Sequence, residues 1–104
     1  MKDYIIILKK LPANAMAIFP FIFVHKSAIP IGEKLLNHER IHLQQQLELL
    51  IIPFYIWYGL EYLFYNIKFR NHNKAYRAIR FEKEAYNNEG NLSYLKNRKH
   101  YNYF

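Results

Sequence analysis

Residues 38–42 read His-Glu-Arg-Ile-His, and this pentapeptide constrains the fold more than any other part of the 104-residue chain. It matches the pattern H-E-x-x-H, which binds metal when it lies on a helix. Residues four apart share one helical face, so His38 and His42 would point the same way and could bind one metal ion. Glu39 projects beside them, where a carboxylate can polarise a metal-bound water. The motif therefore predicts a helix with a metal-binding face.

The residues around the motif predict that this helix covers Glu33–Leu50, because an apolar stripe and a polar face separate at 100° per residue. The stripe consists of Leu36, Leu43, Leu47 and Leu50, and the polar face of Asn37, Arg40, Gln44 and Glu48. His38 and His42 share a third arc with Leu35 and Leu49. We therefore expect both imidazoles to point at protein rather than at open water.

Two strands are expected before this helix. Asp3–Leu8 is short and rich in Ile, and Ala17–Val24 is rich in β-forming residues. Pro20 lies inside the second segment and has no N–H, so this strand should lie at a sheet edge or bend there. An edge strand could also pair with an extended peptide backbone, a common mode of peptide recognition.

Further helices are expected after the motif. Pro53–Phe69 is apolar nearly all round, which is typical of a helix in the core or in contact with lipid. Lys74–Glu89 should form a third helix that ends at Gly90. Residues 92–104 form a basic, Tyr-rich tail, for which we expect one or two helical turns and then frayed chain. The sequence predicts one α+β domain over residues 1–104, mostly helical, with one or two N-terminal strands beside the motif helix.

A third metal ligand must come from His or a carboxylate, because the chain has no Cys. His25, His72 and His100 are candidates, but Glu82 is favoured. On a single helix it would share a face with the apolar residues Ala75, Ala78, Ile79, Ala85 and Tyr86, where a carboxylate is costly unless it is paired or metal-bound. Glu84 would instead lie near Arg77 and Arg80 as a surface charge. Two alternatives remain open: Glu82 in an internal salt bridge, and a histidine pair that binds nothing.

The pair of segments His38-Glu39-Arg40-Ile41-His42 and Glu82-Lys83-Glu84-Ala85 resembles the zincin metallopeptidases whose third ligand is a glutamate. The chain also resembles small uncharacterised bacterial proteins that carry both segments. The resemblance implies His38, His42 and Glu82 as ligands of Zn²⁺, Glu39 as general base, and a peptide or protein as substrate. Relatives often carry an Asp four residues after the ligand Glu, to orient a His; here that position is Tyr86.

An oxyanion stabiliser is also expected, and Tyr86, Tyr76 and His72 are candidates. Tyr76 is the weakest of the three, because a single helix would put it on the charged face. Tyr86 could also act as a second-shell partner through its hydroxyl group, and His72 could act in either role.

The formal charge of +7 would suit an anionic partner, yet no nucleic-acid-binding signature accompanies it, so no nucleic acid is expected. Residues 1–11 lack the features of a secretory signal, which favours a cytoplasmic location. Tyr and Trp in Pro53–Phe69 keep peripheral membrane association open. The function that best fits is a zinc-dependent hydrolase. The alternatives are a non-catalytic, degenerate zincin-like zinc protein, and a basic, aromatic membrane-surface protein. The sequence does not set the oligomeric state.

Overall fold

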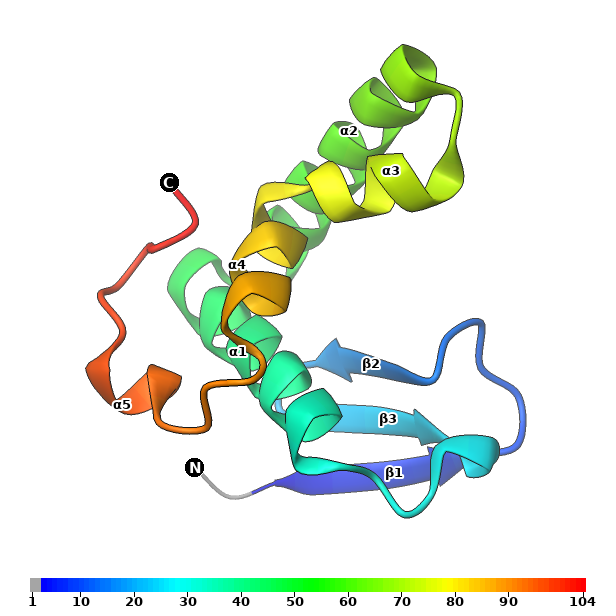
Figure 1. The fold of residues 1–104 in the computed structure, drawn as a ribbon, viewed down its shortest axis with the longest axis vertical. Helices are drawn as coiled ribbons and strands as arrows, with labels where there is room; N and C mark the ends of the chain where they lie inside the picture. The colour runs from blue at the N-terminus through cyan, green and yellow to red at the C-terminus, as the bar shows by residue number, and fades with distance from the viewer. Residues whose placement is uncertain (1–2) are drawn as a thin grey trace.

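The computed structural model describes residues 3–104 and has an α+β fold (Figure 1). Three strands come first: β1 (Tyr4–Leu8), β2 (Ala15–Ile18) and β3 (Phe21–His25), followed by a short 3₁₀ turn at Lys26–Ala28. The helices are α1 (Glu33–Leu49), α2 (Ile51–Phe69), α3 (His72–Ala78), α4 (Arg80–Asn88) and α5 (Tyr94–Asn97). The expected class, mostly helical with N-terminal strands, is confirmed.

The sheet has the strand order β1-β3-β2, with β1 parallel and β2 antiparallel to β3. The expectation of one strand over Ala17–Val24 is wrong, because the chain turns at Phe19 and Pro20 and returns as a hairpin. Proline lacks the donor that a ladder needs, and the turn places Pro20 where none is required. The second half of that segment is therefore the central strand, and β2 is a sheet edge.

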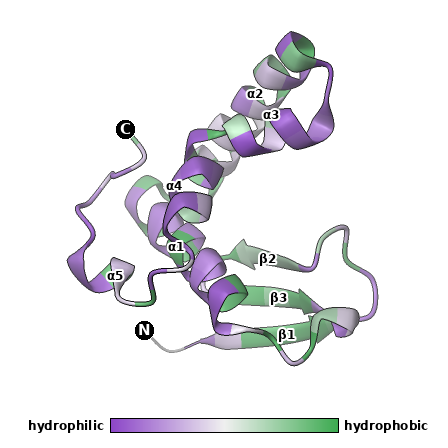
Figure 2. Cartoon of the chain, viewed as in Figure 1, coloured by the Kyte–Doolittle hydropathy of each residue, from purple (hydrophilic) through white to green (hydrophobic). Residues whose placement is uncertain are grey.

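Helix α1 packs across one face of this sheet. Ile22 and Val24 of β3 are fully buried, and they form a core cluster with Ala17 of β2 and Leu43 of α1. The strands are coloured mostly as apolar in Figure 2. The predicted bounds of α1 are confirmed to within one residue, but Leu47 and Leu50 of the expected stripe are exposed. The buried part of the helix is instead its central turns, which carry the H-E-x-x-H motif.

Helix α2 begins at Ile51, just after Leu50, which joins it to α1 with a positive φ of 68°. Phe54 is the residue of α2 that is fully buried, in a second core cluster with Ile79, Phe81 and Tyr103. Among the helices of residues 3–104, none is by itself long and apolar enough to cross a membrane. Helices α1 and α2 meet that criterion only as a pair bent by 112°.

The single helix expected over Lys74–Glu89 is wrong, because the chain breaks at Ile79 into α3 and α4. Ile79 has φ −58° and ψ 129°, which is extended rather than helical backbone. The side chain of Ile79 is fully buried in the second core cluster, so the helix is interrupted at a residue that packs in the core. Because α3 and α4 are separate helices, the 100° periodicity does not continue from one to the other. The face that a residue of α3 occupies therefore does not predict which residues of α4 are buried.

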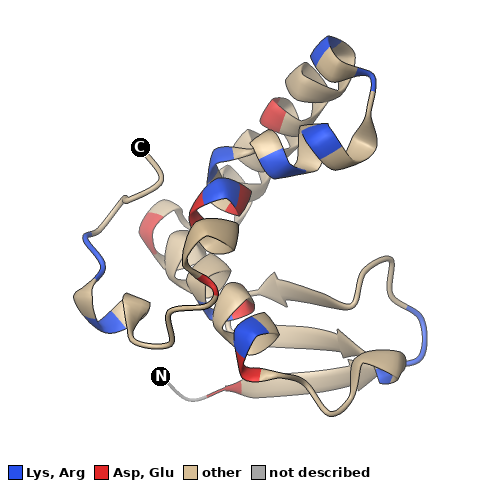
Figure 3. Ribbon diagram, in the orientation of Figure 1, with Lys and Arg blue, Asp and Glu red and all other residues tan. Residues whose placement is uncertain are grey.

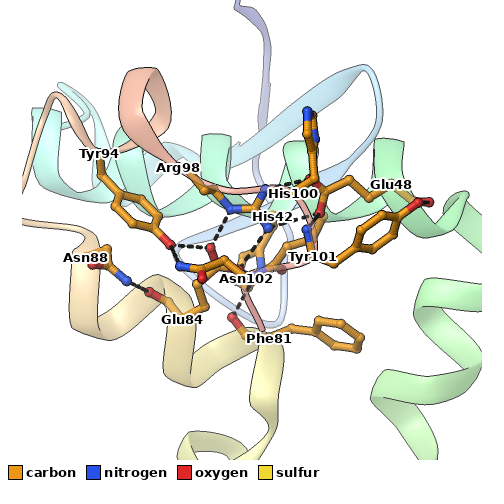
Figure 4. A network of polar contacts seen from close by, with 11 residues as sticks. His42, Glu48, Phe81, Glu84, Asn88, Tyr94, Arg98, His100, Tyr101 and Asn102 are labelled. Carbon is orange, nitrogen blue, oxygen red and sulfur yellow. Dashed lines mark hydrogen bonds and ion pairs between the residues drawn. The ribbon is translucent and has the colours of Figure 1, made fainter. Parts of the chain in front are cut away.

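The C-terminal segment is docked rather than frayed, contrary to expectation. Arg98 lies between two carboxylates, with its guanidinium nitrogens 2.6 Å from Glu48 Oε2 and 3.1 Å from Glu84 Oε1. All three side chains are at most 5% exposed. Figure 4 shows this network, with Tyr94 donating a hydrogen bond to Glu84 and the backbone N–H of Tyr101 donating to Glu48. The tail is thus fixed to α1 and α4 by buried charge.

The docking of the tail predicts that Arg98→Met is strongly destabilising. Removing the guanidinium leaves Glu48 and Glu84 buried without their cation, which costs about 3–5 kcal/mol. We expect the free energy of unfolding, measured by urea titration, to fall by that amount. Lys99→Met is the matched control, because Lys99 is exposed, and it should change stability by no more than about 0.5 kcal/mol. Equal effects of the two substitutions would contradict the docked arrangement.

Candidate functional site

Three side chains from α1 and α4 converge on one point in the interior. His38 Nε2 lies 3.0 Å and His42 Nε2 lies 3.1 Å from Glu82 Oε1, and the two imidazole nitrogens are 3.2 Å apart. All three residues are buried, and together they form a group that could hold a metal ion. The structure therefore brings together the three predicted ligands, although Glu82 lies 40 residues after His42 in the sequence.

The spacing of these three atoms fits a small tetrahedral ion. Zinc bonds of 2.0–2.1 Å to nitrogen and oxygen, at tetrahedral angles, place neighbouring ligand atoms about 3.3 Å apart. The three separations, 3.0, 3.1 and 3.2 Å, are close to that value. One ion could be bound with only small movements of the side chains.

The hydrogen bonds on the far side of each imidazole also favour a cation at this point. His38 Nδ1 lies 2.7 Å from Glu89 Oε2, and His42 Nδ1 lies 2.8 Å from Gln45 Oε1. The amide of Gln45 is oriented by its NH₂ group, which donates to Phe81 O and to Glu84. Both partners of the histidines are acceptors, so each Nδ1 carries a proton and each neutral Nε2 presents a lone pair.

Three lone pairs facing one point repel each other unless a cation lies between them. Without a metal, that cation is a proton. Burial by itself would lower the pKa of His42, but the Glu82 carboxylate raises it to about 9. Burial likewise acts to raise the pKa of Glu82, but the positive charge of His42 and the hydrogen bond from Tyr58 hold it well below its usual range. The cluster therefore favours binding of positive charge.

Glu39 differs from every other buried carboxylate near the site, because it has no bonding partner. It is 5% exposed, and within residues 3–104 it makes no hydrogen bond or ion pair. Burial raises the pKa of this carboxyl above its ordinary value, which the nearby His42 and His38 only partly offset. A buried carboxylate without partners is costly, and it is free to accept a proton from a bound molecule.

Two cavities meet at Glu39 and open the cluster to small molecules. The first has a volume of about 190 Å³ and is bordered by His42, Glu82 and the aromatic residues Phe54, Tyr55 and Tyr58. The second, of about 430 Å³, is bordered by His38 and Glu89. Both are lined by Pro12 and Ala13, in the loop before β2, and by Ala15, its first residue. The edge of the sheet therefore runs along the open side of the three ligands.

The other predicted site residues are placed as follows. Tyr86 packs edge-on against His38, with ring centres 4.6 Å apart, and lines the second cavity. His72 lines the same cavity but is exposed and bonded to the Tyr62 hydroxyl group. Tyr76 was expected on a charged surface; instead it is half-buried and lines both cavities, because the break at Ile79 separates its helix from α4.

Glu84 is also placed differently from expectation. It was expected as a surface charge near Arg77 and Arg80, but it is buried and paired with Arg98. Arg80 instead pairs with Glu61 of α2, and Arg77 lies over the ring of Tyr86. Glu84 thus acts on the site indirectly, by accepting a hydrogen bond from Gln45, which orients His42.

Three functional residues were missed by reasoning from the sequence. Glu89 fills the role of the orienting acid that was sought at position 86, Gln45 orients His42, and Tyr58 donates a 2.6 Å hydrogen bond to Glu82 Oε2. A signal existed for Glu89, since it lies seven residues after Glu82, two helical turns further on the same face. Its position is fixed by Asn37, whose amide donates to the carbonyl groups of residues 88, 89 and 91.

No protein-family model, curated protein or solved structure matches this chain.

The geometry predicts that metal binding depends on Glu82 and not on Glu84. We expect the purified protein to hold one zinc ion per chain by elemental analysis, and to lose it in His42→Ala and in Glu82→Ala. Glu84→Gln tests the other carboxylate of α4: its carboxyl is bonded to Gln45, Tyr94 and Arg98 and is not part of the cluster, so this variant should still bind one zinc ion, with lower affinity because Gln45 orients His42. Zinc retained in Glu82→Ala but lost in Glu84→Gln would show that the third ligand is wrong.

A second prediction concerns Glu89, which orients His38 without joining the cluster. Glu89→Gln weakens the acceptor at His38 Nδ1, and loss of such an orienting group lowers metal affinity by about 10–100-fold. Competition with a chelator of known affinity measures the effect. Glu33→Gln, an exposed acid on the same helix as His38, should leave the affinity unchanged. An unaltered affinity in Glu89→Gln would mean that this hydrogen bond does not support the ligand.

Proposed function

We propose that this protein is a zinc-dependent hydrolase, a minimal metallopeptidase of the kind that uses glutamate as third ligand. The observation that carries the proposal is the unpartnered carboxylate of Glu39, which lies beside the three convergent ligands and borders both cavities. A purely structural zinc site has no need of a free buried base, whereas hydrolysis requires one.

The roles of the residues follow from their contacts. His38, His42 and Glu82 hold the ion, which when bound supplies a water of lowered pKa and polarises a substrate carbonyl group. Glu39 takes the proton from the attacking water and hands it to the leaving amine. Its raised pKa brings the carboxyl nearer to neutrality, where both transfers are efficient. Glu89, Gln45 and Tyr58 keep the ligands in place.

The openness of the site favours catalysis over a structural role. Three protein ligands leave one tetrahedral position for water, and structural zinc sites usually have four. Two cavities lined by Glu39 also border the three ligands, which supports an accessible fourth position. The alternative, a non-catalytic or degenerate zincin-like protein that binds zinc, shares the ligands but assigns no role to the free carboxylate.

An extended peptide is the substrate that suits the edge of β2. Backbone groups alternate along a strand, and Asn14 O faces β3, where it accepts from His25 N, so Ala15 and Ala17 face outward. Gln46 already bonds Ala17 O and Phe19 N. Ala15, which lines both cavities, is therefore the residue best placed to pair with a substrate backbone. A peptide complex in which the ligand avoids Ala15 would contradict this assignment.

The proposal predicts that Glu39→Gln strongly reduces hydrolysis without loss of zinc. Removing the general base should lower kcat by about 10²–10⁴-fold, because the water then loses its proton acceptor. Cleavage of fluorescently labelled casein by the zinc-loaded protein measures activity, and elemental analysis measures the metal. Glu33→Gln is again the control and should be as active as the wild type. If the zinc-loaded wild type cleaves no peptide or protein, the non-catalytic alternative replaces this proposal.

A further prediction assigns the oxyanion to Tyr76. Tyr76 is half-buried and lines both cavities. Burial, followed by the negative charge of Glu82, raises the pKa of its hydroxyl group, so the group stays protonated and can donate. Tyr76→Phe should lower kcat by about 10²–10³-fold with little change in KM or zinc content. Tyr65→Phe, which removes a hydroxyl group from a residue that lines neither cavity, is the matched control. Full activity in Tyr76→Phe would return the role to Tyr86 or His72.

A further inference from the structure

Helix α2 presents an apolar face to solvent along nearly its whole length. Five residues at spacings of three and four form it, and each is between 55% and 73% exposed: Ile52, Ile56, Leu60, Leu63 and Ile67. At 100° per residue they fall within about 80° of one another. Pro53 and Phe64, also exposed, widen the arc to about 120°. We call these seven residues the outer face of α2.

This pattern is the reverse of an ordinary surface helix, in which charged residues occupy the exposed arc. No charged residue falls within the outer face. The inward arc of the same helix carries Phe54 in the core and Tyr58 at the metal-binding cluster. Helix α2 is therefore apolar on both sides, and within residues 3–104 only the inner side is covered.

A groove on the outer face adds polar groups at one margin. It has a volume of about 660 Å³ and is lined by Ile56, Leu60 and Phe64, with Trp57 and Tyr65 at its side. Trp and Tyr have apolar rings with polar edges, and they are enriched where apolar and aqueous regions of a membrane meet. The two charged residues of the groove neutralise each other, since Arg80 pairs with Glu61 at 2.6 Å.

Cations without acidic partners gather at the far end of this helix. Residues 62–79 contain four of them, Lys68, Arg70, Lys74 and Arg77, and no Asp or Glu. Figure 3 shows these basic positions at the tip of α2 and along α3, away from the acidic residues of α1 and α4. None of the four forms a salt bridge with an acid among residues 3–104. The apolar face thus ends in an excess of positive charge.

We propose that the outer face of α2 docks on the surface of a bilayer that contains anionic lipids. The helix, about 28 Å long for its 19 residues, would lie in the interface with its apolar arc among the acyl chains. Lys68, Arg70 and Lys74 would bind the headgroups. A second copy of the chain is the less suitable occupant, because it carries the same +7 charge and the same cationic end. An anionic surface is complementary in charge to this face.

Co-sedimentation with vesicles tests the proposal, using the full chain and no activity measurement. Vesicles of phosphatidylcholine alone are compared with vesicles that also contain phosphatidylglycerol. We expect binding to the anionic vesicles, reduced at least about tenfold by Ile56→Gln with Leu60→Gln. The matched control is Ile7→Gln with Leu92→Gln, which removes equally exposed apolar side chains from other parts of the molecule. Circular dichroism checks that each variant is folded.

A second pair of variants separates charge from apolar contact. Lys68→Gln with Lys74→Gln should weaken binding to anionic vesicles at least about tenfold, whereas Lys9→Gln with Lys10→Gln should not. Three results would overturn the proposal: no vesicle binding by the wild type, equal loss in the control variants, or a dimer in sedimentation velocity that Ile56→Gln with Leu60→Gln abolishes. The last would assign the outer face to a second copy instead. None of these outcomes depends on whether the protein binds zinc or cleaves peptides.

Discussion

Mutual repulsion of three lone pairs is the constraint around which the interior is arranged. His38, His42 and Glu82 turn their acceptor atoms to one point, and the separations of 3.0–3.2 Å leave room for one small cation. Each of the three is held from behind: the histidines by Glu89 and Gln45, and the glutamate by Tyr58. Because these partners fix the tautomers and orientations, the ligands cannot relax into ordinary mutual hydrogen bonds without a proton or a metal.

Support for the cluster extends to the end of the chain. Gln45 orients His42 only because its own amide is held by Glu84, and Glu84 is held in turn by Arg98. Arg98 also binds Glu48, one turn after Gln45 on α1, so the C-terminal segment connects α1 to α4 (Figure 4). Such a buried network is costly when one member is missing, which couples the geometry of His42 in the candidate metal site to the docking of the tail.

The features that the sequence could predict are those that depend on the periodicity of a single helix. The spacing of His38 and His42 within one uninterrupted helix fixes their common face, so the motif carried its own geometry. Glu82 was found because a carboxylate among small apolar residues is unusual, although the helix assumed for that argument is broken at Ile79. No Pro or Gly marks the break at Ile79 in the sequence, so a single helix was assumed, and that assumption misplaced Glu84 and Tyr76. The buried ion pairs of Arg98 with Glu48 and Glu84 join residues that are 50 and 14 positions apart in the sequence, and no local pattern encodes such contacts.

Helix α2 connects the two proposals physically. Its inner arc supplies Phe54, Tyr55 and Tyr58 to the first cavity. Its outer face, which includes Leu60 only two residues after Tyr58, is exposed to solvent. A helix that lines the candidate active site on one side and meets lipid on the other would place the cluster within one helix diameter, about 10 Å, of the bilayer surface. Substrates held at that surface would then be concentrated near the cleft. Because the cations lie at the far end of α2, binding of the headgroups would also orient the molecule, so that the edge of β2 takes a fixed position relative to the membrane.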